Sequence, residues 1–284
     1  MRTRPTTVWT LAAAAALTLT LAPATASAGD GRSGNGSDRL QAVGLAGDRT
    51  LVRFDTDRPD RARVLGDVAG LDAADRDLVG IDVRARDGAL YAVGRGGGVY
   101  TVDTRSLQAR KVLTLTVPLD GRDFGVDVNP AADALRVVSD RGQNLRQPLA
   151  TPGAATVADT PLTSPPAAGT TTGVTGAAYT NNDVDPATAT TLFDLATATD
   201  QVVVQAPANA GTLSATGATG VDLTGDTGFD IAPGRRGGQV AYAVAGGRLY
   251  SVDLLSGRFT DAGRVGGGQV TDPVTDIALP LGRR

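Results

Sequence analysis

A four-residue phrase recurs along this chain, and its spacing limits the possible folds more than any other feature. The phrase is a glycine, an apolar residue, an aspartate and a second apolar residue; one copy lacks the aspartate and the last copy lacks the glycine. The third positions of successive copies are 45, 48, 55 and 46 residues apart. Such intervals accommodate four short strands with their turns. The copies lie at residues 80–83, 125–128, 173–176, 228–231 and 274–278.

The segments that follow two of these copies are also alike. Each contains two runs of β-branched and aromatic residues joined by glycines, which is the pattern of a β-hairpin. An aspartate ends the second run, where its side chain can accept a backbone N–H two residues further on. A further strand is expected after each hairpin. The matching segments are 90–93 with 241–244, 99–103 with 249–253, and 109–114 with 259–265.

The two ends of the chain complete this scheme. Residues 40–43, 51–55 and 63–65 match the outer strands of a repeat that has no inner strand, whereas 275–279 match an inner strand with nothing after it. Pairing of the two ends would close a ring and leave no open ladder at the seam. We therefore predict an all-β fold, a single β-propeller of about five four-stranded blades over residues 39–284. A sixth, shortened blade at 220–223 and a β-sandwich with a chance repeat are the alternatives.

The first 28 residues have the features of a secretory signal peptide. Arg2 and Arg4 precede an apolar stretch over 8–21, and Ala-Ser-Ala at 26–28 offers small residues for cleavage. The apolar stretch is short for a bilayer span, so an uncleaved anchor is the weaker alternative. Residues 29–38 read as a flexible leader. We expect a secreted, extracellular protein without a membrane span.

Several residue types that commonly carry chemistry are missing from the chain. It has no histidine and no cysteine, and all thirty acidic residues are aspartates. The lack of histidine excludes Ser-His-Asp catalysis and imidazole metal sites, and the lack of cysteine excludes disulfides and lipid attachment at a cysteine. A net charge of −3 gives no basic stripe for nucleic acid. Acid–base chemistry outside the signal peptide would have to come from aspartate, tyrosine or Lys111, the only lysine.

The aspartates of the phrase are the first candidates for a site. If each phrase forms the inner strand of a blade, these side chains recur around the central channel. A ring of carboxylates repels itself and favours a hard cation such as Ca²⁺. The interpretation that we favour over ion binding is that each aspartate bonds backbone amides and joins neighbouring blades. The candidate metal ligands in the channel are Asp82, Asp127, Asp230 and Asp276.

Two other groups of polar residues are weaker candidates. Asp183 and Asp185 lie in an Asn-Asn-Asp-Val-Asp run with the Asp-x-Asp spacing that begins an EF-hand loop, although its glycine and final glutamate are missing. For this run we favour a solvated turn over a metal site. Arginines on either side of one hairpin could bind a carboxylate or phosphate together with neighbouring amides. The candidate ligand-binding residues there are Arg136, Gln143, Asn144 and Arg146.

Several longer strings occur in order between residues 123 and 205. They include Phe-Gly-Val-Asp-Val-Asn-Pro at 124–130, Leu-Arg-Val-Val-Ser-Asp at 135–140, Gly-Gln-Asn-Leu-Arg at 142–146 and Ala-Ala-Tyr-Thr-Asn-Asn at 177–182. In these strings the chain resembles a bacterial family known as domain of unknown function 4394, and a weaker likeness covers most of 40–280. The resemblance implies an exported, propeller-like domain. It implies no activity and no catalytic residues.

Two classes of function are compatible with these features. We favour a monomeric, exported, non-enzymatic binding or scaffold domain for an unknown extracellular ligand or partner, because the chain has no histidine, glutamate or cysteine. The competing hypothesis is an Asp-based hydrolase or lyase, with or without Ca²⁺, that acts in the propeller channel; it rests on analogy with other propellers. No cofactor other than Ca²⁺ is expected.

Overall fold

The computed structural model describes residues 39–280, except 186, 235–237, 267 and 269. The signal peptide and the leader expected over 1–38 lie outside the described residues. Regular helix in the described part consists of two 3₁₀ turns, Ala73–Asp75 and Ala208–Ala210. None of the described helices is both long enough and apolar enough to span a membrane.

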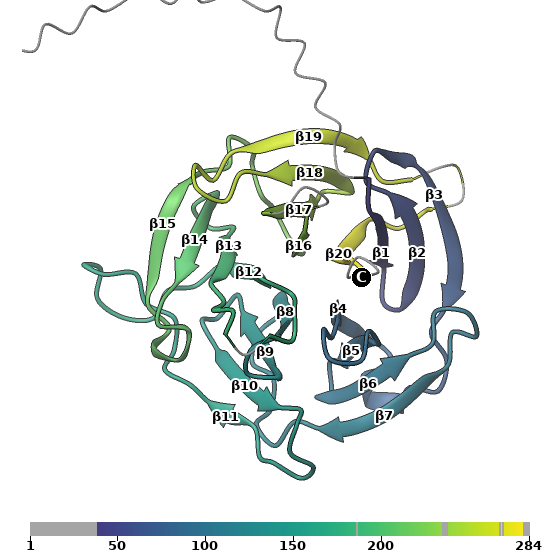
Figure 1. The fold of residues 1–284 in the computed structure, drawn as a ribbon, viewed down its shortest axis with the longest axis horizontal. Coiled ribbons are helices and arrows are strands. Elements are labelled where there is room, and N and C mark those ends of the chain that lie inside the picture. The colour runs from purple at the N-terminus through teal and green to yellow at the C-terminus, as the bar shows by residue number, and fades with distance from the viewer. Residues whose placement is uncertain (1–38, 186, 235–237, 267, 269, 281–284) are drawn as a thin grey trace, which may run out of the picture. The chain divides into compact units, whose positions relative to one another are not determined.

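Five antiparallel sheets of four strands form a ring, so the chain is a five-bladed β-propeller (Figure 1). Residues 220–223, the expected site of a sixth blade, lie outside any strand. Blade 1 contains β20 (Val274–Ala278), β1 (Gln41–Ala46), β2 (Thr50–Asp55) and β3 (Arg58–Asp67). Blade 2 contains β4 (Leu78–Val83), β5 (Leu90–Gly94), β6 (Gly98–Val102) and β7 (Ala109–Thr114).

The other three blades follow the same order, from the innermost strand to the outermost. Blade 3 contains β8 (Phe124–Asn129), β9 (Ala134–Ser139), β10 (Asn144–Pro148) and β11 (Val157–Ala158). Blade 4 contains β12 (Val174–Tyr179), β13 (Leu192–Ala196), β14 (Gln201–Gln205) and β15 (Leu213–Ala218). Blade 5 contains β16 (Thr227–Pro233), β17 (Gln239–Ala245), β18 (Arg248–Val252) and β19 (Phe259–Arg264).

The ring closes as the sequence predicts. β20 pairs antiparallel with β1, so that one blade contains an inner strand from the C-terminal end and three strands from the N-terminal end. This pairing joins Val43 to Ala278 and Leu45 to Asp276. Because of this pairing, the last strand of the described chain joins a sheet formed by its first three strands, and the seam of the ring has no unpaired strand.

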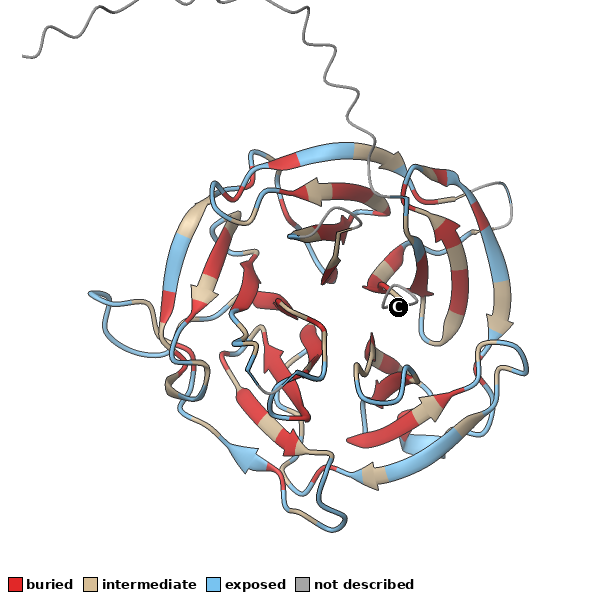
Figure 2. Ribbon diagram, viewed as in Figure 1, coloured by how far each residue is buried: buried red, intermediate tan, exposed pale blue. Residues whose placement is uncertain are grey.

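The hydrophobic core lies between the blades and close to the centre. All six residues of β12 are buried, whereas in the outermost strand β7 most are exposed (Figure 2). Between blades 4 and 5, for example, Leu195 packs in one cluster with Phe229, Ile231 and Ala243. Burial therefore falls from the inner strands to the rim, which is the expected gradient where sheets pack face to face around an axis.

The glycine of the phrase is required because neighbouring inner strands approach closely. A Cβ at Gly125 would lie 2.6 Å from the backbone nitrogen of Ala177 in the next blade. A Cβ at Gly228 would lie 2.4 Å from the Cα of Asp276. Real Cβ atoms do not come so near to backbone, so these positions exclude any side chain. The aspartate two residues later points to the same face of its strand.

Cross-strand pairing corrects the expected copy of the phrase in blade 4. Gly176 pairs with Leu195 and Ala178 pairs with Phe193, which are the ladder positions that the glycine and the aspartate hold in blades 2, 3 and 5. The prediction of a copy at 173–176 is therefore wrong by three residues. The true copy keeps its glycine and replaces the aspartate with Ala178.

Cross-strand pairing also corrects the position of Asp276. This residue pairs with Leu45, which corresponds to Val93 because each pairs with the second residue of the following strand, Leu51 or Val99. In blade 2 the partner of Val93 is Gly80, so Asp276 occupies the glycine position of the phrase. The aspartate position of blade 1 is Ala278. The expectation that Asp276 is equivalent to the other three aspartates is therefore wrong by two residues along the strand.

Candidate functional site

Three aspartates of the phrase meet at the centre of the ring. One carboxylate oxygen each from Asp82, Asp127 and Asp230 lies within 4.8 Å of those of the other two. These residues come from β4, β8 and β16, the inner strands of blades 2, 3 and 5 (Figure 1). Their relative exposures are 4%, 1% and 2%. We call Asp82, Asp127 and Asp230 the pore triad.

Backbone amides hold the carboxylates of the pore triad in place. Asp82 accepts the N–H of Val83 at 2.6 Å and the N–H of Val128, in the next blade, at 2.8 Å. Asp230 likewise accepts an N–H of its own strand and, at 2.6 Å, that of Leu279 beyond β20. Inner strands present unpaired N–H groups at the channel, and a buried N–H without an acceptor is costly. The aspartates therefore join neighbouring blades, as one of the two alternatives from the sequence predicts.

Asp276 also joins two neighbouring blades, at a position two residues earlier along the inner strands. Its carboxylate accepts the N–H of Ile277 at 2.9 Å and that of Ile81, in blade 2, at 2.7 Å. It is buried, with 7% exposure. Because Asp276 occupies a glycine position, it lies beside the pore triad and outside it.

Asp127 is the member of the pore triad that backbone amides satisfy least. It accepts one backbone hydrogen bond, from Tyr179 in blade 4. Its Oδ1 atom is buried and has no hydrogen-bond donor. An unpaired carboxylate oxygen away from water is energetically costly unless a proton or a cation compensates it.

Burial raises the pKa of every carboxyl in this group. It raises the pKa of Asp82 to about 6, against the hydrogen bonds from Val128 and Val83. Burial, followed by repulsion from the other triad carboxylates, raises the pKa of Asp127 well above its usual value. The pKa of Asp230 and that of Asp276 also lie well above the usual value, first because of burial. The channel therefore favours protons or cations over three bare negative charges.

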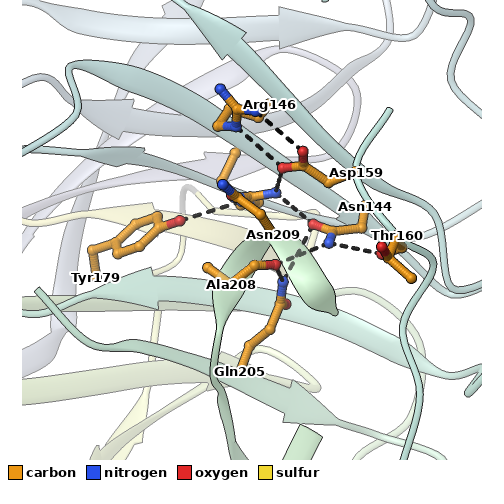
Figure 3. Close-up of polar contacts among 9 residues, drawn as sticks. Asn144, Arg146, Asp159, Thr160, Tyr179, Gln205, Ala208 and Asn209 are labelled. Atoms are coloured by element: carbon orange, nitrogen blue, oxygen red, sulfur yellow. Dashed lines mark hydrogen bonds and ion pairs between the residues drawn. The ribbon is translucent and has the colours of Figure 1, made fainter. Parts of the chain in front are cut away.

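Arg136, one of the predicted anion-binding residues, lies inside a closed hydrogen-bond network. Figure 3 shows residues of this network, among them Asn144, Asp159 and Tyr179. Arg136 is 2% exposed. Its guanidinium donates to Asp159 at 2.8 Å, to Asn144 at 2.6 Å, to Asn209 at 2.8 Å and to the Tyr179 hydroxyl at 3.2 Å. Asp159 supplies a negative charge next to the guanidinium. The structure thus brings Arg136 and Asn144 together as predicted and fills their donor and acceptor sites with protein groups.

The other two predicted ligand-binding residues differ in position. Arg146 joins the network by donating two hydrogen bonds of 3.2 Å to Asp159. Gln143 lies apart from it: its side chain accepts the N–H of Asp120 and donates to the carbonyl of Pro118. We call Arg136, Asn144, Arg146 and Asp159 the arginine cluster.

Asp194 is a buried acid that the sequence reasoning missed. It lies on β13 with no exposed surface, and neither of its carboxylate oxygens has a hydrogen-bond donor. Burial raises its pKa well above the usual value, and the positive charge of Arg136 opposes this only in part. Asp194 pairs with Ala177 in the ladder, and the corresponding residue in blade 5 is Ala243. An aspartate at a position that is apolar in another repeat is the signal that identifies it.

The loop with Asp-x-Asp spacing forms local turns. Asp183 accepts the N–H of Asp185 at 2.8 Å, and Asp185 accepts the N–H of Ala187 at 2.9 Å. Side-chain-to-backbone bonds two residues apart are the Asx turns expected of aspartate in loops. The cluster of acidic groups within the described residues that has the spacing of a metal site is the pore triad, and it does not include this loop.

A small hollow lies at the end of the channel where the inner strands begin. Its volume is about 150 Å³, and Thr275, the residue before Asp276, is part of its wall. Asp226 also lines it and hydrogen-bonds to Asp123; partial loss of water contact and this bond raise the pKa of Asp226 to about 7. We call this space the mouth hollow. Its other charged residues are Asp48, Asp77, Arg95 and Arg122.

Two larger pockets open in crevices between consecutive blades, at the end of the inner strands away from the mouth hollow. One, of about 660 Å³, lies between blades 4 and 5, and the other, of about 630 Å³, lies between blades 1 and 2. Both fall in the size range of small-molecule sites. We call them pocket A and pocket B. The sequence reasoning did not find them, because their residues come from strand ends in different repeats.

The comparisons with known proteins add a family and no activity. A family model described as a domain of unknown function (DUF4394) matches residues 50–278. No curated protein matches the chain. A protein of unknown function from Bacteroides caccae is 12% identical with a TM-score of 0.41, over 78% of this chain and 72% of that one. Another, from Bacteroides thetaiotaomicron VPI-5482, is 13% identical with a TM-score of 0.48, over 85% of this chain and 65% of that one. Because the family model spans more than half of the chain, the chain belongs to the DUF4394 family.

Proposed function

We propose that this protein is an exported, non-catalytic domain that binds a small polar ligand in pockets A and B. The observation behind the proposal is that the two pockets occupy equivalent places in the propeller. The turn that lines pocket A contains residues 251–255, and its counterpart in pocket B contains residues 101–105. Phe193 and Val43 also correspond, since Phe193 pairs with Ala178 and Val43 pairs with Ala278. Export is supported by the signal-peptide features of residues 1–28.

The lining of the pockets suits a polar ligand with some apolar surface. Both pockets combine hydroxyl, amide or charged groups with apolar side chains. Pocket B contains Arg53 and Arg105, whereas pocket A has Leu255 where pocket B has Arg105. Arginine is well suited to carboxylate and phosphate groups. We therefore expect pocket B to prefer a ligand with an acidic group.

Two of the equivalent crevices elsewhere are filled by side chains of the protein. Between blades 2 and 3, Arg84 binds Asp133 through two hydrogen bonds of 2.7 and 2.6 Å. These residues correspond to Thr180 and Gln239 of pocket A. Between blades 3 and 4, the arginine cluster occupies the crevice. Pockets A and B are thus places where small or apolar residues replace bulky ion pairs.

The aspartates that line the pockets are committed to the backbone. Asp103 accepts the N–H groups of Arg105 and Ser106 at 2.8 and 3.0 Å. Asp253 accepts the corresponding N–H groups in pocket A. These bonds lower the pKa of both aspartates. An acid–base catalyst at neutral pH needs the opposite shift, which supports binding over catalysis.

A ligand screen followed by one substitution tests the proposal. The purified protein is titrated against glycan, cell-wall and peptide panels, and acidic ligands are tested further with Arg105→Leu. We expect this variant to fold, because leucine stands at the equivalent position of pocket A. We expect its affinity for acidic ligands to fall about tenfold or more. Arg63→Leu, an exposed arginine on the outer strand β3, is the matched control. Unchanged affinity in Arg105→Leu, or hydrolytic turnover by the protein, would overturn the proposal.

The mouth hollow supports a second candidate function, an Asp-based hydrolase or lyase. Asp226 and Asp123 share a hydrogen bond, and a carboxyl with a pKa of about 7 can act as an acid or a base at neutral pH. This pair differs from the channel aspartates to which the sequence reasoning gave that role. Turnover of a polysaccharide or phosphoester that disappears in Asp226→Asn and persists in Asp194→Asn would favour this function over binding.

A further inference from the structure

We propose that the pore triad binds one calcium ion between the inner strands of blades 2, 3 and 5. The ligands are one carboxylate oxygen each from Asp82, Asp127 and Asp230. The site is separate from pockets A and B, so it does not depend on the proposed binding function. The ion would connect three blades that are distant in the sequence.

The distances among the three carboxylates fit an ion of this size. Calcium binds oxygen at 2.3–2.6 Å, so two of its ligands lie at most about 4.6–5.2 Å apart. The three oxygens of the pore triad lie within 4.8 Å of one another. Magnesium demands near-octahedral geometry and gives up its water ligands reluctantly, whereas calcium tolerates flexible geometry. A buried group of three carboxylates that are close enough to share one ion therefore suits calcium better than magnesium.

The backbone holds the triad in an arrangement that leaves oxygen lone pairs free. An ionised carboxylate offers about four acceptor positions, and backbone N–H groups use two of them on Asp82. Asp127 uses fewer, and its buried Oδ1 atom has no donor at all. This oxygen is an observation independent of the clustering of acids. A cation ligated by Oδ1 would satisfy it without any rearrangement of the hydrogen bonds already made.

No protein cation compensates the pore triad within the described part of the chain. Arginine and lysine form fifteen ion pairs there, and none involves a member of the triad or Asp276. The buried Asp159, by contrast, has an arginine partner, Arg136, at 2.8 Å. Buried carboxylates are normally paired or coordinate a metal. The triad has the second kind of environment.

The mouth hollow lies near the triad. It is lined by three acids and two arginines (Asp48, Asp77, Asp226, Arg95 and Arg122) and by Thr275, the residue before Asp276. Asp276 in turn accepts the N–H of Ile81, the neighbour of Asp82.

Calcium titration of the purified protein tests the proposal. After treatment with a chelator, the protein is titrated with CaCl₂ by calorimetry, and its Tm is measured with CaCl₂ and with EDTA. We expect one ion per chain, a Tm that rises with calcium concentration and a smaller response to MgCl₂. In Asp127→Asn we expect calcium affinity to fall about tenfold or more. Absence of calcium binding by the unaltered protein, or an equal response to MgCl₂, would overturn the assignment.

Two further variants locate the ion. Asp194→Asn makes the same change at another fully buried aspartate outside the triad, and we expect it to bind calcium as the unaltered protein does. Asp230→Asn should lose affinity as Asp127→Asn does, and it provides the same test if Asp127→Asn fails to fold. Calcium binding that survives both triad substitutions would place the ion elsewhere and would contradict the proposal.

Discussion

The pore triad and the arginine cluster are two buried polar groups that solve the problem of charge in opposite ways. The arginine cluster contains its own counterion, because Asp159 lies 2.8 Å from the Arg136 guanidinium. The pore triad contains three acids and, among the described residues, no basic partner. The first group is complete as it stands. The second is satisfied at the backbone and uncompensated in charge, so removal of one charged group should have opposite effects in the two places.

The largest effect is expected in the arginine cluster. Arg136→Met removes the donor to Asn209 and one donor to Asn144, and it leaves the buried Asp159 with only the partly exposed Arg146 as its partner. Breaking a buried ion pair on one side costs about 3–5 kcal/mol, and we expect the free energy of unfolding in urea to fall by that amount. Arg146→Met is the control, because its side chain is 30% exposed and the expected loss is below about 1 kcal/mol. Similar losses in both variants would show that Arg136 is not the centre of the network.

A smaller change of opposite sign is expected in the pore triad. In the presence of EDTA at pH 8, Asp127→Asn removes one of three mutually repelling carboxyls and keeps an acceptor for the N–H of Tyr179. One unit of pKa shift corresponds to about 1.4 kcal/mol, so we expect the free energy of unfolding to rise by about 1–2 kcal/mol. Urea titration of the calcium-free protein measures it. A loss of stability would mean that the triad is compensated without an ion.

Asp194 should make the free energy of unfolding depend on pH. The native state holds its proton because its pKa is raised well above the usual value, whereas the unfolded chain releases that proton above a pKa of about 3.9. The free energy of unfolding therefore falls as pH rises through the interval between the two pKa values, by about 1.4 kcal/mol per pH unit for this group. Asp194→Asn should remove that share of the slope in the pH range just above the unfolded-state pKa. An unchanged slope would show that Asp194 is ionised in the native protein.

The smallest effect is expected in the exposed loop. Asp183→Asn and Asp185→Asn keep an oxygen that can accept the same turn hydrogen bonds. We expect the free energy of unfolding to change by less than about 0.5 kcal/mol and calcium affinity to stay the same. A loss of calcium binding in either variant would move the ion from the pore triad to this loop.

The sequence predicts the architecture well because the fold repeats. Five copies of a phrase, two matching hairpins and two incomplete ends were sufficient for the blade count and for the pairing of β20 with β1. Side-chain register was less certain. Asp276 was aligned with the other aspartates of the phrase because of its residue type, although its pairing with Leu45 places it at a glycine position. Ala178 was missed because an alanine gives no sign that it stands at the aspartate position.

The partners of the candidate residues were not accessible to sequence reasoning. Arg136 and Asn144 lie in one hairpin and could be grouped from the sequence. Asp159 directly follows β11, and Asn209 lies in the segment after β14. Both accept hydrogen bonds from Arg136, and no local sequence pattern specifies these contacts. Asp194 was missed for the same reason, since its burial depends on the face of blade 3 that covers it. The pockets between blades depend on which crevices remain unfilled.

A crystal structure of the protein grown with CaCl₂ tests the central claim most directly. We predict one peak of electron density for calcium between Asp82, Asp127 and Asp230, with carboxylate oxygens at about 2.3–2.6 Å and a contact to Oδ1 of Asp127. If no such peak is present and the three carboxyl groups of the pore triad instead hydrogen-bond to one another, the calcium site is contradicted.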